Sequence, residues 1–138
     1  MFLLLLLFLA TLPSPTSANL VTFNITMLCN APFYAKVKLV EEDFFESSND
    51  VLHYELVQSV APPGSKVHSK TLILRKFPYG DWSFFYEFFL RIVHTCAISY
   101  YICWQSEVKH VPTWDDRKVD FLVDLSGLGG GCPGDTDL

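Results

Sequence analysis

The chain has 138 residues, a formal net charge of −5, and 50% hydrophobic residues. A chain of this length can form one domain with a buried core, and no internal repeat indicates a second unit. The acidic balance argues against nucleic acid as a partner, because phosphate binding relies on clustered basic side chains.

Residues 1–18 have the pattern of a secretory signal peptide. The segment from Phe2 to Leu9 is entirely apolar, and Pro13 and Pro15 would end any helix there. Thr16 and Ala18 occupy positions −3 and −1 of a small-residue cleavage site,. The apolar run is shorter than the ~20 residues that a membrane-spanning helix needs. The segment contains no Lys or Arg, although signal peptides usually begin with a positively charged region,. The alternative interpretation is therefore a buried N-terminal strand or helix.

Cleavage after Ala18 would leave a mature domain over residues 19–138. No later stretch is apolar for long enough to be a transmembrane helix,. We therefore expect a secreted, extracellular protein of one domain with no membrane span.

The first expected strand covers residues 21–29, where apolar and polar side chains alternate,. Cys29 falls on the apolar face and would point toward the core. Asn24 and Thr26 share the polar face and belong to the N-glycosylation sequon Asn24-Ile25-Thr26,. We expect Asn24 to carry a glycan that extends into solvent.

Further short strands follow, each bounded by turn-forming residues. They are expected over residues 35–39, 51–57, 71–74, 84–96, 102–111 and 119–125. No segment shows a sustained helical period with capping residues. About seven or eight short strands of this kind predict an all-β fold, either a β-sandwich or a small barrel.

An acidic, turn-rich segment follows the second expected strand and begins with Glu41, Glu42 and Asp43. Consecutive carboxylates are a candidate Ca²⁺ site, because Ca²⁺ takes several oxygen ligands. The segment lacks the spacing and the glycine of an EF-hand loop. We therefore expect a solvated acidic loop, with no metal site and no cofactor.

Several segments follow one another in a recognisable order, namely KVKLVEED from Lys36, NDVL, FLRIVHTC ending at Cys96, Val111-Pro112 and DFLVDL. Together they resemble the nematode transthyretin-like family, whose members are small secreted domains. The resemblance covers most of the mature chain. It implies a transthyretin-like β-sandwich of prealbumin-like, immunoglobulin-like architecture. It implies no enzyme activity, because the family has none established.

Four cysteines, an even number in a chain expected to be secreted, indicate disulfides,. No CxxC pair supports a zinc site. Cys96 ends one expected strand and Cys103 begins the next, so a hairpin would bring the two together. We therefore favour the pairs Cys96–Cys103 and Cys29–Cys132, while the other two connectivities stay open.

His94 lies two residues before Cys96 on the same face of an expected strand. A catalytic pair would need Cys96 as a free thiolate, whereas a disulfide is its expected state. The chain has no nucleophile-elbow, phosphate-loop or H-E-x-x-H motif,. We expect no catalytic residue, and the alternative is a hydrolytic enzyme on a transthyretin-like fold.

Aromatic residues concentrate before Cys96 and on either side of Cys103. The candidate apolar binding surface consists of Trp82, Phe85, Phe89, Tyr100 and Tyr101. Such a surface would bind a small apolar ligand or an extracellular or cell-surface protein. The alternative is that these side chains belong to the core or lie under a covering loop. The sequence thus predicts an extracellular binding or interaction protein of unidentified ligand.

Overall fold

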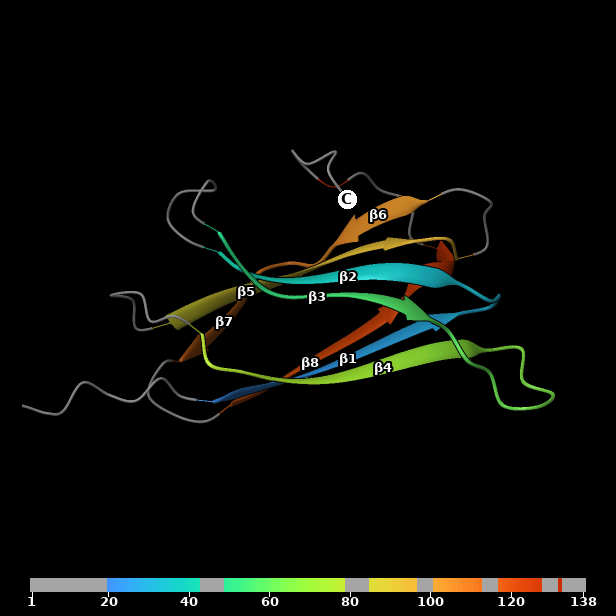
Figure 1. The fold of residues 1–138 in the computed structure, drawn as a ribbon, viewed down its shortest axis with the longest axis horizontal. Coiled ribbons are helices and arrows are strands. Elements are labelled where there is room, and N and C mark those ends of the chain that lie inside the picture. Colours follow the sequence, from blue (N-terminus) through green and yellow to red (C-terminus); the bar gives the residue numbers. More distant parts are fainter. Residues whose placement is uncertain are drawn as a thin grey trace, which may run out of the picture.

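A computed structural model describes residues 20–42, 49–78, 85–96, 101–112, 117–127 and 132. Within these residues, eight strands form two sheets that face each other, as Figure 1 shows. The predicted all-β sandwich is therefore confirmed. The expected signal peptide, residues 1–18, lies outside the described residues. The part of the chain that is described contains no apolar helix of membrane-spanning length.

The smaller sheet has three strands in the order β4-β1-β8. Its central strand β1 (Val21–Cys29) pairs antiparallel with β4 (His68–Lys76) and parallel with β8 (Arg117–Asp124). Every second side chain of β1 is at most 1% exposed, as the alternation of apolar and polar residues predicts,. These inward residues are Val21, Phe23, Ile25, Met27 and Cys29. The short turn η2 (Leu125–Gly127) follows β8.

The larger sheet places β2 (Tyr34–Glu41) between β3 (Asp50–Gln58) and β5 (Phe85–His94). Two short strands, β6 (Ile102–Gln105) and β7 (Lys109–Pro112), pair with opposite ends of β5. The single strand expected over 102–111 is therefore interrupted. At the break, the Ser106 amide donates to the Leu90 carbonyl (2.8 Å), and the Ser106 hydroxyl accepts from the Leu90 amide (2.9 Å).

The core lies between the two sheets and is built from their inward side chains. Phe23 of β1 and Phe88 of β5 meet edge to face, with ring centroids 4.9 Å apart,. In the second half of β5 the outward side chains are buried as well, because Phe89, Arg91 and Val93 are each at most 8% exposed. Burial on both faces explains why this strand is apolar on both faces in the sequence.

Glu41 does not belong to a solvated loop, and this expectation was wrong. It is the last residue of β2 and is 1% exposed. It continues the inward set of this strand and pairs with Phe88 of β5, which is itself fully buried. The charge of Glu41 suggested a loop, but its position in the alternation determines its burial. Glu42 is half-buried, and Asp43 lies outside the described residues.

Candidate ligand pocket

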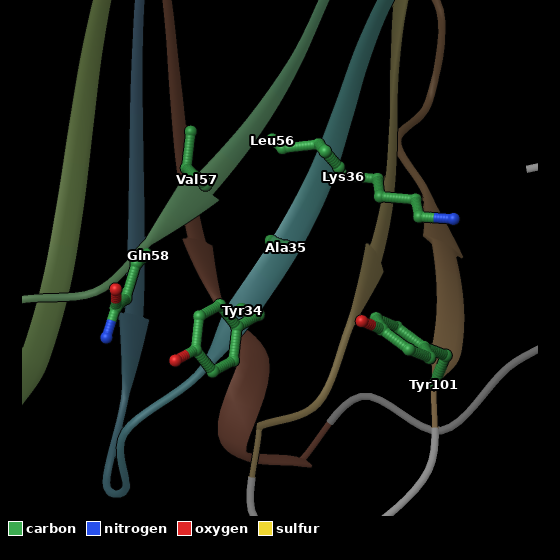
Figure 2. A pocket seen from close by; sticks show the side chains of 7 residues that line it. All are labelled: Tyr34, Ala35, Lys36, Leu56, Val57, Gln58 and Tyr101. Carbon is green, nitrogen blue, oxygen red and sulfur yellow. The ribbon is translucent and has the colours of Figure 1, made fainter.

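A pocket of about 310 Å³ lies at one end of the larger sheet. It is lined by β2, by β3 and by Tyr101, which precedes β6 and lies across β5 from β2. Its outward side chains are Tyr34, Lys36, Leu56, Gln58 and Tyr101. Ala35 and Val57 point toward the core and contribute the floor. Figure 2 shows Tyr34 and Tyr101 on either side of Ala35, so the two phenol rings form opposite walls.

The strand register explains why these residues share one face. Tyr34 pairs with Gln58, and Lys36 pairs with Leu56, so alternate residues of β2 and β3 stand side by side on the outer surface,. Tyr101 immediately precedes β6, on the same side as Cys103. Tyr34 is 56% exposed, Leu56 65% and Tyr101 57%. Large apolar side chains that are exposed together are a feature of binding surfaces.

Basic side chains lie on this face of the sheet. The Lys36 ammonium lies 5.6 Å from the centre of the Tyr101 ring, close enough for a cation–π interaction,. Lys38 and Arg91 are paired neighbours in the next row of the sheet. Arg91 donates two hydrogen bonds to the Gln105 side chain, at 3.1 and 2.8 Å. Three basic side chains, Lys36, Lys38 and Arg91, therefore lie at or beside the pocket in a protein whose net charge is negative.

The described residues of the predicted aromatic surface, Phe85, Phe89 and Tyr101, do not form one surface. Phe85 (43% exposed) is at one end of β5, whereas Tyr101 is beyond the other end, where Ile102 pairs with His94. Phe89 is only 4% exposed and packs against the Arg91 guanidinium, 5.8 Å from its ring centre. Of these three described residues, only Tyr101 lines the pocket. Trp82 and Tyr100 lie outside the described residues.

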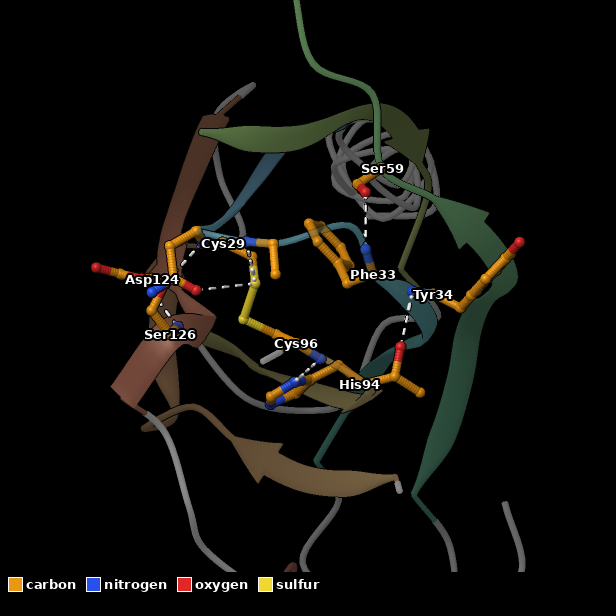
Figure 3. Close-up of a disulfide and its surroundings, with 11 residues drawn as sticks. Cys29, Phe33, Tyr34, Ser59, His94, Cys96, Asp124 and Ser126 are labelled. Carbon is orange, nitrogen blue, oxygen red and sulfur yellow. Dashed lines mark hydrogen bonds between the residues drawn. A yellow bond between two sulfur atoms is a disulfide. The ribbon is translucent and has the colours of Figure 1, made fainter. Parts of the chain in front are cut away.

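The predicted disulfide pairing was wrong. All four cysteines are oxidised, but the bonds join Cys29 to Cys96 and Cys103 to Cys132. The first bond connects the end of β1 to the residue two positions after β5 and so links the two sheets, as Figure 3 shows. Its Cα atoms are 5.9 Å apart, and those of the second bond are 5.5 Å apart, both within the usual range,.

Cys96 and Cys103 cannot pair because their side chains lie on opposite faces of the larger sheet. Cys96 continues the inward set of β5 and is 3% exposed. Cys103 pairs with Val93, which is on the outward set. Proximity along a hairpin brings two backbones together, but alternation along each strand decides whether two side chains can bond.

His94 is fully buried beside the Cys29–Cys96 bond (Figure 3). Its Nδ1 accepts a hydrogen bond from the Cys96 amide at 3.2 Å, and Nε2 has no partner among the described residues. Burial lowers the pKa of His94, because removal from water penalises the charged imidazolium,. The His94–Cys96 pair therefore consists of a buried, neutral imidazole and a sulfur that is already bonded.

Asn24 occupies the outer face of the smaller sheet, as the alternation of β1 predicts. It lies between Ile73 of β4 and Asp120 of β8, and its Nδ2 donates to Asp120 Oδ1 at 2.7 Å. An asparagine Nδ2 carries two hydrogens, so the attachment of a sugar would leave one for this bond. The sequon is therefore presented on the solvent side of the sandwich.

We expected no metal site in the acidic segment that includes Glu41 and Glu42. Among the residues that the structure describes, no three His, Cys, Asp or Glu side chains are grouped so that they could hold a metal ion. Glu41 is buried between strands, so its carboxylate does not join Glu42 on the surface.

Comparison of the chain with models of known protein families, with curated proteins and with solved structures finds no match.

Proposed function

We propose that the chain is a secreted, extracellular binding protein of the transthyretin-like family that takes a small ligand with an apolar body at the Tyr34–Tyr101 pocket. The observation that carries this proposal is the exposure of Tyr34, Leu56 and Tyr101 around one pocket. Its volume of about 310 Å³ is at the lower end of the range for small-molecule sites,.

Secretion is supported by the signal-peptide pattern of residues 1–18 and by two disulfides, which persist mainly in oxidising compartments,. The Asn24 sequon on the outer face fits the same route. When cells secrete the protein, its N-terminus should be Asn19. Glycosidase treatment should lower its mass, and Asn24→Gln should remove that shift. A product that starts at Met1, or one without a glycan, would contradict this route.

Binding is tested with N-phenyl-1-naphthylamine, a neutral apolar dye whose fluorescence rises when it leaves water. Leu56→Ser should weaken dye binding at least fivefold, because a substitution that removes buried apolar contact costs about 1 kcal/mol or more. The matched control is Leu122→Ser, since Leu122 is 74% exposed on the outer face of the other sheet. Equal dye binding by both variants and the parent would reject the pocket as the binding site.

The alternative function, a hydrolytic enzyme, gains no support from the His94–Cys96 pair. The Cys96 sulfur is bonded to Cys29, and His94 is 0% exposed. A nucleophilic mechanism would need a free thiolate within reach of substrate.

A protein partner on the cell surface would use the same exposed aromatic side chains. Its binding would then be blocked by the dye.

A further inference from the structure

The outer face of the larger sheet can be read as rows of paired residues. The row at the pocket contains Gln58, Tyr34, Thr95 and Tyr101; the next contains Leu56, Lys36, Val93 and Cys103; the third contains Tyr54, Lys38, Arg91 and Gln105. Among the residues that the structure describes, these rows hold Lys36, Lys38 and Arg91 and no acidic side chain. The charge at the pocket is therefore opposite in sign to the net charge of the protein.

Lys36 is the cation that reaches the pocket. It stands between the apolar side chains of Leu56 and Val93, and its ammonium lies over the Tyr101 ring. Among the described residues, no carboxylate pairs with this ammonium. An ammonium that is held by an aromatic ring and flanked by apolar side chains retains donors for an anionic group.

We propose that the ligand of this pocket is an amphipathic anion, whose apolar or aromatic body lies between Tyr34 and Tyr101 and whose acidic group meets Lys36. The proposal rests on the proposed binding function and names the class of ligand. The two phenol rings provide flat apolar walls, which suit an aromatic or aliphatic body,.

Two dyes that differ by one acidic group test the proposal. They are N-phenyl-1-naphthylamine, which is neutral, and 8-anilinonaphthalene-1-sulfonate, which is the same ring system with a sulfonate. Because the sulfonate also changes hydrophobicity, the measured quantity is the effect of each substitution on each dye. Both titrations use the mature, oxidised protein at low ionic strength, where surface charge interactions are least screened.

Lys36→Met should weaken sulfonate binding about two- to fivefold, the range expected for one partly exposed charge contact. It should leave binding of the neutral dye unchanged, because methionine keeps the apolar stem. Lys36→Arg should retain sulfonate binding. The matched control is Lys118→Met on the opposite sheet, which makes the same change in net charge and should alter neither dye.

Several outcomes would overturn the proposal. If Lys36→Met weakens both dyes equally, or Lys118→Met weakens the sulfonate as much, Lys36 does not recognise the anion. If only the neutral dye binds and Leu56→Ser abolishes that binding, the pocket binds an apolar ligand but does not recognise an anionic group. If neither dye binds the parent, both proposals fail.

Discussion

The two disulfides occupy contrasting surroundings. Cys29 and Cys96 are 1% and 3% exposed and connect the two sheets through the core, whereas Cys103 and Cys132 are only half-buried. The loops that they close contain 67 and 29 residues. In the chain-entropy model these lengths give ~4.4 and ~3.6 kcal/mol of stabilisation, which are nearly equal. Any large difference between the two bonds must therefore come from the folded protein.

The largest effect is expected from the double substitution Cys29→Ala and Cys96→Ala. It removes a long-loop crosslink and also leaves a space in a close-packed core. The free energy of unfolding should fall by about 5 kcal/mol or more, enough to unfold many domains of this size. Denaturant titration followed by circular dichroism measures this loss.

The double substitution Cys103→Ala and Cys132→Ala should cost no more than the ~3.6 kcal/mol of the loop-closure contribution, because no comparable cavity forms at a half-buried site. Equal losses for the two double variants would show that loop entropy alone governs both bonds.

The contrast between the buried and the half-buried disulfide also predicts the order in which they are reduced. Brief treatment with a mild thiol, followed by alkylation and peptide mapping, should label Cys103 and Cys132 before Cys29 and Cys96, because access limits thiol exchange.

A smaller effect is expected from His94, which lies beside the buried bond. Because burial lowers its pKa, the unfolded chain takes up this proton at a higher pH than the folded chain does,. The contribution of His94 to the free energy of unfolding is therefore constant above about pH 6.5. It declines as the pH falls from there toward the lower folded pKa.

His94→Asn provides the comparison, since an amide oxygen can accept from the Cys96 amide but does not titrate in this range,. The free energy of unfolding should decline more steeply between pH 7 and pH 5 in the parent than in the variant. His53 and His110, which pair with Glu55 and Glu87, are present in both proteins and so cancel in the difference. Parallel declines would show that His94 does not titrate within the fold.

The strands could be predicted from the sequence where one face is apolar and the other polar. In β1, the alternation from Val21 to Cys29 gave the strand, its inward face and the outward position of Asn24. Ser106 interrupts a run that looks continuous, because its side chain bonds to the backbone of β5. That contact joins distant parts of the chain and leaves no local pattern.

The correct disulfide pairing had a signal in the alternation. Ile102 and Trp104 are the apolar residues of their strand, so Cys103 belongs with Gln105 on the outer face. Cys29 and Cys96 each continue an apolar set. The pocket had no such signal, because Tyr34, Leu56 and Tyr101 become neighbours only through the register of separate strands.

The parallel pairing of β1 with β8 has a consequence for how the protein is made. Asn24 and Asp120 touch across these strands although they are 96 residues apart in the chain. The central strand of the smaller sheet therefore keeps one unpaired edge until synthesis reaches residue 124. Contacts between such distant segments slow folding and leave apolar edges exposed to other chains meanwhile. Cys29 and Cys96 are both synthesised before β8, so an early bond between them could hold β1 against its opposing sheet while that edge is open.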